Sequence, residues 1–274
     1  MRLEGAKFGL IGYPLGHTLS PFVHKQLFTL SNTESFSYDV MEIPPDKLET
    51  EIKNLNALCG YNITIPHKCE IIKYLDNIDP ETAGRYGAVN CVLNKNGVST
   101  GYNTDCFGFK KSLEQSGVSL SGKVLVLGFG GAGRMMAMEA KFCGADVTVA
   151  VRDTNKIPPE QKSQMAFCDI NKIIGEFDLI INSTPVGMYP NIDGCPANDE
   201  VIKNAKAVFD AVYNPGDTRL LIKAKEHNIT AIGGMAMLVW QAAVAHNIWY
   251  NADFRDKDIS DIIKKAEEFL INMN

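Results

Sequence analysis

Alternating and continuous hydrophobic runs mark out strands in the first part of the chain. Residues 7–12 form a short apolar run bounded by glycines, and residues 37–43 alternate before two prolines, so both ranges predict strands. Further strands are expected at residues 61–65, 88–93 and 98–102. The last two flank an Asn-Gly pair at residues 96–97, which supplies the positive φ that a hairpin turn needs.

Between these runs, apolar residues recur at helical spacing after residues that favour a helix start. Ser20 followed by Pro21 predicts an N-cap with proline at the first helical position. Asp46 with Glu49 three residues later resembles a capping box. Further helix starts are expected at Pro66 and Asp105.

After Gly117 the pattern changes to continuous apolar runs at regular spacing. We expect buried strands at residues 124–127, 147–151, 179–182, 208–212 and 230–232. Helical stretches separate them, as in a parallel sheet that is covered on both faces. From residue 259 to residue 270 the apolar residues share one helical face opposite lysines and glutamates, which predicts an amphipathic helix.

The charge balance excludes some classes of partner. The chain has 274 residues, of which 45% are hydrophobic and 22% charged, with a formal net charge of −5. Without a basic excess, we expect neither nucleic acid nor an anionic membrane surface as a partner. Residues 229–252 carry no charge, but Gln241, His246 and Asn247 lie inside them and a Gly-Gly pair interrupts them. They predict a strand and a buried helix rather than a membrane span.

The seven cysteines and five histidines indicate neither disulfides nor a metal. No C-x-x-C or H-x-x-x-H pair occurs, and the cysteines lack the spacing of a zinc site. We therefore expect reduced thiols in a cytoplasmic protein, and no metal site.

A glycine-rich loop follows the expected strand at residues 124–127. Gly128, Gly130 and Gly133 have G-x-G-x-x-G spacing directly after an apolar strand and directly before a helix, which is the context of a dinucleotide-binding loop. The backbone N–H groups here, including those of Gly131 and Ala132, would meet a pyrophosphate at the positive end of a helix. A purely structural corner and a methyltransferase loop are the alternatives.

The residues after the second strand of this half would contact the ribose. An acidic residue there accepts from a 2′-hydroxyl, whereas an arginine accommodates a 2′-phosphate. Arg152, Asp153 and Lys156 all lie in this segment. We predict NADP from Arg152 and keep NAD as the alternative because of Asp153; the same charges would also suit a solvated loop.

Small polar residues follow the strand ends of the first half, where ligands of open α/β sheets bind. They are Thr18, Ser20, Asn62, Thr64, Lys68, Asn90 and the run 103–105. Each alone has a structural explanation as a cap, a turn residue or a solvated lysine. Together with the glycine loop they indicate carbonyl reduction, because hydride transfer leaves an alkoxide that needs a proton. Lys68 as the proton donor and Asp105 as the carboxylate that orients it form the predicted catalytic pair.

Eight motifs, in order along the chain, resemble the shikimate dehydrogenases and their quinate/shikimate relatives. They lie at residues 12–14 with 17–21, 62–68, 87–90, 101–105, 128–133, 183–188, 210–215 and 233–243. The resemblance implies reversible NADP-linked reduction of 3-dehydroshikimate to shikimate, a step of aromatic amino-acid biosynthesis. It also implies that Lys68 and Asp105 are the catalytic pair.

The same resemblance implies two sets of binding residues. The expected substrate residues are Thr18, Ser20 and Tyr213 around the carboxylate, and Asn62, Thr64, Asn90, Asp105 and Gln241 near the ring hydroxyls, together with Lys68. Hydroxyl donors aided by a helix N-terminus can hold a carboxylate without arginine. Thr184 and Gly234, which lie in two of the matched motifs, join Arg152 and the glycine loop as expected cofactor residues.

Three positions depart from the family pattern. Thr18 stands where serine is usual, and Val151 and Asp153 replace the asparagine and threonine of the usual Asn-Arg-Thr. The extra methyl of Thr18 leaves quinate open as a substrate. A carboxylate beside a 2′-phosphate repels it, so NAD also stays open. A quinate/shikimate dehydrogenase that uses NAD and a non-catalytic nicotinamide-binding sensor are the alternative functions.

The expected fold is α/β in two domains. Residues 1–106, completed by C-terminal helices within 241–274, would form an α/β substrate domain. Residues 107–240 would form a doubly wound Rossmann-type dinucleotide-binding domain. We expect a monomer or homodimer whose partner is a small-molecule substrate.

Overall fold

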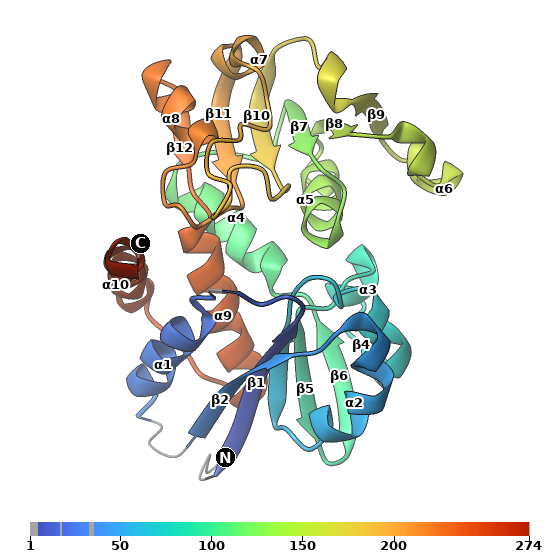
Figure 1. Cartoon of the computed structure of the whole chain (residues 1–274), viewed down its shortest axis with the longest axis vertical. Helices are drawn as coiled ribbons and strands as arrows, with labels where there is room; N and C mark the ends of the chain where they lie inside the picture. The colour runs from blue at the N-terminus through green and yellow to red at the C-terminus, as the bar shows by residue number, and fades with distance from the viewer. Residues whose placement is uncertain (1–4, 17, 33–35, 274) are drawn as a thin grey trace. The chain divides into compact units, whose positions relative to one another are not determined.

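The computed structural model describes residues 5–16, 18–32 and 36–273 of the chain. The chain divides into two compact units, coloured along its length in Figure 1. Unit 1 comprises Met1–Gly108 with Leu238–Phe269, and unit 2 comprises Phe109–Met237 with Leu270–Asn274. Each unit has its own six-stranded sheet, and the α/β class expected from the sequence is confirmed.

Unit 1 is built on a mixed sheet in the order β2-β1-β3-β5-β6-β4. Its strands are β1 Ala6–Gly12, β2 Phe36–Glu42, β3 Gly60–Ile63, β4 Asn77–Ile78, β5 Cys91–Lys95 and β6 Val98–Tyr102. β1 runs parallel to β2 and β3, whereas β5 runs antiparallel to β3 and β6. The β5–β6 hairpin turns at Asn96 and Gly97, both at positive φ, as the sequence predicts.

Helical segments cover both faces of this sheet (Figure 1). They are α1 Ser20–Leu30, α2 Leu48–Leu55, the 3-10 helix η2 Glu70–Tyr74, α3 Ala83–Tyr86 and α9 Met235–Tyr250. α1 and α9 pack on one face, where Phe8, Phe28 and Trp249 form an aromatic core. α2, η2 and α3 pack on the other face, around Tyr61 and Ile71. The chain ends in α10 Asp256–Met273, whose apolar face is buried through Ile259, Ile262, Ala266 and Leu270.

Unit 2 holds a fully parallel sheet in the order β12-β11-β10-β7-β8-β9. Its strands are β7 Lys123–Leu127, β8 Asp146–Val151, β9 Ala166–Asp169, β10 Phe177–Asn182, β11 Ala205–Asp210 and β12 Thr230–Ile232. Counted from β7 as the first, the strand order is 3-2-1-4-5-6, which is the order of doubly wound dinucleotide-binding sheets. The order reverses between β7 and β10, and ligands of such sheets bind beyond the carboxyl ends of the strands at this point.

Helices flank both faces of the unit 2 sheet. They are α5 Gly131–Phe142, α6 Pro159–Lys162, α7 Asp199–Lys203 and α8 Arg219–Glu226, and α4 Asp105–Gln115 enters the unit from unit 1. α7 and α8 share one apolar core with β7, β10 and β11. The other five strands of this sheet lie near their predicted ranges. β9, whose residues are at most partly buried, was not predicted. A strand at the edge of a sheet has a weaker hydrophobic pattern than a central one.

Helices begin at Ser20 and at Leu48, close to two of the predicted starts, but the predicted caps at Ser20 and Asp46 and the predicted helix from Pro66 were wrong. Ser20 is the first residue of α1 rather than its N-cap, and its hydroxyl is engaged by Thr18. Asp46 lies in the 3-10 turn η1 Pro45–Lys47, and no side chain caps η1 or α2. The segment from Pro66 forms turns and the short η2, because the Lys68 carbonyl accepts from Val89 N–H instead of continuing a helix.

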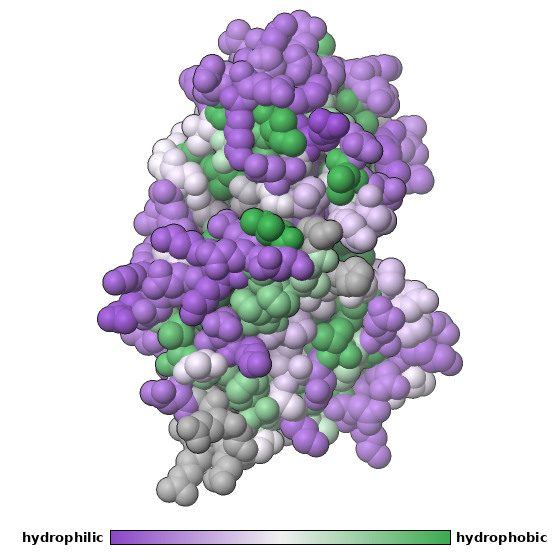
Figure 2. All heavy atoms as spheres, turned by 60° about the vertical axis from the view of Figure 1, so that its left-hand side comes forward, coloured by the Kyte–Doolittle hydropathy of each residue, from purple (hydrophilic) through white to green (hydrophobic). Residues whose placement is uncertain are grey.

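Burial of these apolar faces leaves an exterior that is mainly hydrophilic, with small hydrophobic areas, in the view of Figure 2. The uncharged segment 229–252 forms β12 and the largely buried α9, as predicted. Within the ranges that the structure describes, no helix is long and apolar enough to cross a membrane.

Candidate functional site

The predicted catalytic pair is in contact within unit 1. Lys68 lies in the turn that follows β3, and Asp105 is the first residue of α4, directly after β6. Lys68 Nζ donates to Asp105 Oδ2 at 2.5 Å, and the two side chains are only 16% and 9% exposed. The turn holds its place because Val89 N–H donates to the Lys68 carbonyl at 2.7 Å. A lysine and a carboxylate 37 positions apart are therefore held as one partly buried acid–base unit.

Asn90 connects this pair to a second set of polar side chains. Its amide nitrogen donates to Asp105 Oδ1 at 2.8 Å, and it lies 3.3 Å from Gln241 Oε1. Thr104 completes the cluster, because its backbone N–H donates to Asn90 Oδ1 at 2.6 Å and its hydroxyl reaches Gln241 Oε1 at 3.3 Å. Gln241 also donates to the Leu238 carbonyl within α9. Both oxygens of the Asp105 carboxylate thus have a donor, which fixes its orientation.

Asn62 joins the same cluster from β3. Its amide nitrogen donates to the Asn90 carbonyl at 3.3 Å, and its side chain is almost fully buried. Five predicted site residues from β3, two turns, α4 and α9 are therefore linked by hydrogen bonds: Asn62, Lys68, Asn90, Asp105 and Gln241.

Three more of the predicted substrate residues lie in unit 1, outside this cluster. Thr18 and Ser20 bond to each other at the start of α1, where the Thr18 hydroxyl accepts from Ser20 N–H at 3.2 Å. Thr64 follows β3, and its backbone N–H donates to the Ile11 carbonyl. Tyr213 belongs to unit 2, after β11, so its part in the substrate site stays a prediction.

Two residues that support this cluster had no predicted role of their own. Thr104 lies inside a recognised motif, and its position between Asn103 and Asp105 was the available signal. His67 is buried beside Lys68, and its Nε2 lies 2.6 Å from the Ile43 carbonyl, which tethers the lysine turn to the end of β2. The sequence shows no signal for that contact, because the partner is a backbone carbonyl 24 positions away.

The glycine loop of unit 2 leaves open space at the N-terminus of α5. Gly128 has φ +93°, a conformation that L side chains rarely adopt, and a Cβ on Gly133 would lie 2.4 Å from Ser183 Oγ. A Cβ on Gly130 would meet nothing within 4 Å. The first and third glycines are thus required by the turn and by close packing, whereas the second leaves open space at the N-terminus of α5. That space and the adjacent N–H groups, including those of Gly131 and Ala132, fit a pyrophosphate.

The end of β8 carries the expected ribose-binding segment. Arg152 and Lys156 are exposed. Asp153 has a local structural role: it is the N-cap of the 3-10 helix η3 Thr154–Lys156, and its Oδ1 accepts from Asn155 N–H at 3.0 Å.

Thr184 is held by a buried network at the end of β10. Its hydroxyl and N–H both donate to Asn182 Oδ1, at 2.7 and 3.0 Å, and Asn182 in turn donates to Asp210 Oδ1 at 2.8 Å. Asp210 is fully buried, and burial raises the pKa of its carboxyl despite donors from Thr218, Val212 and Asn182. Gly234 is also packed tightly, because a Cβ there would lie 2.4 Å from the Ala211 carbonyl.

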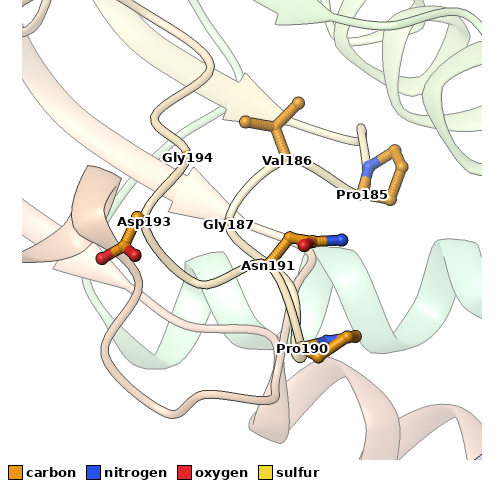
Figure 3. A pocket seen from close by; sticks show the side chains of 7 residues that line it. All are labelled: Pro185, Val186, Gly187, Pro190, Asn191, Asp193 and Gly194. Atoms are coloured by element: carbon orange, nitrogen blue, oxygen red, sulfur yellow. The ribbon is translucent and has the colours of Figure 1, made fainter.

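The loop after Thr184 encloses a depression of about 440 Å³ (Figure 3). All the residues that line it belong to this one loop: Pro185, Val186, Gly187, Pro190, Asn191, Asp193 and Gly194. Asp193 is the one charged residue in this lining, and its side chain is 90% exposed. The depression has no buried polar group that would bind a ligand. In the described ranges, no group of three or more His, Cys, Asp or Glu could hold a metal ion.

The chain resembles known proteins over nearly all of its length. A family model described as the shikimate dehydrogenase substrate binding domain matches residues 10–92. Shikimate dehydrogenase (NADP(+)) of Caldanaerobacter subterraneus subsp. tengcongensis is 38% identical over 264 residues, which cover 92% of this chain and 93% of the relative.

The chain belongs to the shikimate dehydrogenase family. A shikimate dehydrogenase (NADP(+)) from one strain of Clostridium perfringens is 40% identical over 250 residues, which cover 88% of this chain and 91% of that relative. Among solved structures, shikimate dehydrogenase 1 of Peptoclostridium difficile has a TM-score of 0.90 at 31% identity, covering 97% of this chain and 99% of its own. Shikimate 5-dehydrogenase of Thermus thermophilus, in complex with NADP(H) and shikimate, has a TM-score of 0.86 at 32% identity. The match covers 95% of this chain and 99% of the Thermus thermophilus chain.

Proposed function

We propose that this member of the shikimate dehydrogenase family catalyses the reversible reduction of 3-dehydroshikimate to shikimate with NADP, a step of aromatic amino-acid biosynthesis. The observation that supports it best is the Lys68–Asp105 contact inside a cluster that also holds Asn62, Asn90 and Gln241. Such a cluster offers amide donors and acceptors, an ammonium group and a carboxylate to a small molecule rich in hydroxyls. Curated relatives of this length and similarity bear the name shikimate dehydrogenase (NADP(+)).

In the direction of reduction, Lys68 donates a proton to the carbonyl oxygen of the substrate. When bound, NADPH supplies the hydride that reaches the carbonyl carbon. The Lys68 ammonium neutralises the charge that develops on that oxygen and delivers the proton. In the reverse direction, the Lys68 amine accepts the proton of the substrate hydroxyl as hydride leaves the same carbon.

Asp105 keeps Lys68 in place through one carboxylate oxygen and is itself held by Asn90 through the other. This double attachment restricts the rotamers of both catalytic side chains before substrate arrives, so less conformational entropy is lost in binding. Asn62, Thr64 and Gln241 would contact ring hydroxyls, and Thr18, Ser20 and Tyr213 would hold the carboxylate.

The cofactor would bind the glycine loop of unit 2 through its pyrophosphate. Gly128, Gly130, Gly131, Ala132 and Gly133 form the open cradle at the start of α5. Arg152 would contact the 2′-phosphate, and Thr184 and Gly234 would lie along the rest of the cofactor. Because Asp153 is engaged as the cap of η3, its carboxylate has a structural reason to be there that does not require a 2′-hydroxyl partner.

A steady-state comparison of NADP and NAD, each with shikimate and with quinate, tests the proposed activity. We expect shikimate-dependent reduction of NADP, at a kcat/KM well above that of every other pair. Tight cofactor binding without turnover of either acid would contradict the proposal.

A substitution of Lys68 tests the mechanism. Lys68→Met keeps much of the side-chain length and removes the ammonium, so we expect kcat to fall by about 10² to 10⁴. NADP affinity, measured by titration of cofactor binding, should be unchanged. Lys53→Met, at an exposed lysine of α2, is the matched control and should keep wild-type turnover. Full turnover by Lys68→Met would exclude the lysine from the proton transfer.

A further inference from the structure

Tyr38 makes a contact with Asn62 that the proposed chemistry does not include. Its hydroxyl donates to Asn62 Oδ1 at 3.0 Å. Tyr38 lies on β2 and Asn62 on β3, and β1 separates these strands in the sheet. Adjacent strands are about 4.8 Å apart, so a long side chain such as that of tyrosine is needed to span the intervening strand.

The ring of Tyr38 is held independently of this hydrogen bond. It stacks on the imidazole of His24 from α1, with a centroid separation of 4.1 Å and an interplanar angle of 15°. Nδ1 of His24 in turn lies 2.8 Å from Nε2 of His246 on α9. Burial keeps the Tyr38 pKa well above its ordinary value, so its phenol stays protonated and can donate.

Two contacts, with the Tyr38 hydroxyl and with the Asn90 carbonyl, together hold the Asn62 carboxamide in one orientation. An asparagine side chain offers one acceptor oxygen and two N–H donors. The oxygen accepts from Tyr38, and one N–H donates to the Asn90 carbonyl. A flipped carboxamide would place its oxygen against the Asn90 carbonyl, which is an unfavourable pairing of two acceptors, and the Tyr38 hydroxyl would have to change from donor to acceptor.

We propose that Tyr38 is a positioning residue, which acts with the Asn90 carbonyl to hold the Asn62 carboxamide so that it presents an N–H donor, and not an acceptor, to a hydroxyl of the substrate. This inference rests on the proposed function, because Asn62 is a substrate residue only within it. The site would therefore select a substrate with a hydroxyl group whose oxygen accepts a hydrogen bond from the Asn62 side chain.

Tyr38→Phe removes the hydroxyl and leaves the stacked ring. We expect the KM for shikimate, and its Kd measured by calorimetry, to rise by about 3- to 10-fold, as for the loss of one hydrogen bond. The KM for NADP should stay unchanged, and kcat should stay within about two-fold because the contact acts on binding.

Tyr61→Phe is a matched control on the neighbouring residue. Tyr61 precedes Asn62 on β3 and faces the opposite side of the sheet, and its buried hydroxyl has no hydrogen-bond partner. Its loss should leave the KM and Kd for shikimate at their wild-type values.

Two further variants test the direction of the hydrogen bond. In an Asn62→Ala background, Tyr38→Phe should have no additional effect, because the residue through which it acts is gone. Asn62→Asp keeps an acceptor for Tyr38 but has no donor for substrate, so it should weaken shikimate binding at least as much as Asn62→Ala.

Three results would overturn the role of Tyr38. They are an unchanged Kd for shikimate in Tyr38→Phe, an equal effect of Tyr38→Phe with and without Asn62, and wild-type affinity in Asn62→Asp. A wild-type protein that neither binds nor oxidises shikimate would instead refute the proposed function, before any variant is made.

Discussion

At the scale of single residues, the three glycines of the cofactor loop differ in what they can tolerate. Gly130 has ordinary extended backbone angles and open space where a Cβ would stand. We expect Gly130→Ala to keep the free energy of unfolding within about 0.5 kcal/mol of wild type. The new methyl group would occupy the space for the pyrophosphate, so the Kd for NADP should rise by about 10-fold or more.

Gly133→Ala provides the contrast, because its Cβ would clash with Ser183 Oγ and the Gly128 carbonyl. That variant should lose stability, by about 1–3 kcal/mol, in chemical denaturation. Equal loss of stability in both variants would mean that Gly130 is a packing residue rather than part of a binding cradle.

Asp153 carries a negative charge near the expected 2′-phosphate and also caps η3. A substitution can separate the effect of the charge from the effect of the cap. Asp153→Asn keeps an oxygen that can cap η3 but removes the negative charge near the expected 2′-phosphate. We expect the KM for NADP to fall by about 2- to 5-fold, and this gain to shrink as salt is added. The KM for NAD should change less.

Asp169→Asn is a close control for that measurement. Asp169 caps the 3-10 helix η4 Ile170–Lys172 in the same way, with Oδ1 accepting from Asn171 N–H at 2.9 Å. Asp169 pairs with Val151, two residues before Asp153, so its neutralisation should shift the preference between NADP and NAD less than that of Asp153 does. A similar shift from both variants would show that net charge, and not the position of Asp153, sets cofactor affinity.

The residues that carry chemistry could be predicted from the sequence more readily than those that support them. Lys68, Asp105 and the glycines stand in motifs whose spacing has a chemical reason. Tyr38 and His67 act through a side chain or a carbonyl that is distant in sequence, and each looks like an ordinary core residue when read alone. Only the register of β2, β1 and β3 reveals the first of these contacts.

At the scale of elements, Thr218 links a helix start to a buried carboxylate. It is the N-cap of α8, where its hydroxyl accepts from Leu221 N–H, and the same hydroxyl donates to Asp210 Oδ2 at 2.6 Å. Thr218→Val keeps the shape but removes both bonds. We expect the free energy of unfolding to fall by about 2–4 kcal/mol, from about 1 kcal/mol for the cap and the rest for a buried acceptor without its donor.

Asn198→Ala separates these two contributions. Asn198 caps α7 by accepting from Val201 N–H, and it has no comparable tie to a buried acid. Its loss should cost about 1 kcal/mol in the same denaturant titration. If Thr218→Val costs no more than Asn198→Ala, the Asp210 contact contributes nothing beyond the cap.

The positions of the strands could be predicted from the hydrophobic pattern of the sequence. The helix starts could not, because they depend on contacts that a local pattern does not contain. The strands β7, β8, β10 and β12 lie within a residue or two of their predicted ranges because buried parallel strands are continuous apolar runs. The Ser20 hydroxyl, in contrast, accepts from the Thr18 hydroxyl. The turn after Pro66 is held by the N–H of Val89, which lies before β5 and donates to the Lys68 carbonyl. Such competition appears only once the chain is folded.

At the scale of the whole molecule, the order of the unit 2 strands and the separate sheet of unit 1 agree with the expected two-domain α/β fold. The alternation of strands and helices after Gly117 was sufficient to predict a doubly wound sheet. The mixed sheet of unit 1 could not be derived in full, because the two-residue β4 has no pattern of its own and is defined only by its pairing with β6.

The overall stability should depend on pH through a pair of buried histidines. Burial lowers the pKa of His24 to about 3 and holds that of His246 well below its ordinary value. His24 Nδ1 bonds to His246 Nε2, and His246 Nδ1 bonds to the Tyr250 hydroxyl, which lies 3.2 Å from Ser31 Oγ. The pair is therefore neutral in the folded protein at pH values where both histidines are protonated in the unfolded chain.

As pH falls below about 6.5, the unfolded state takes up protons that the folded state does not, so folding stability declines with falling pH. The slope should approach about 1.4 kcal/mol per pH unit for each histidine between pH 6 and 4.5. The carboxylates of lowered pKa, such as Asp178 and Asp258, act only below this window, and the raised pKa of Asp210 has the opposite sign.

Denaturant titrations at a series of pH values measure this slope directly. The double variant His24→Asn with His246→Gln retains amide groups that can bond to each other but cannot titrate. Its stability between pH 6 and 4.5 should therefore fall less steeply, by an amount that corresponds to up to about two fewer protons taken up on unfolding. Its absolute stability is not the test, because the smaller side chains also leave a cavity. A wild-type slope in the double variant would mean that neither histidine gains a proton on unfolding and that other groups set the acid response of this fold.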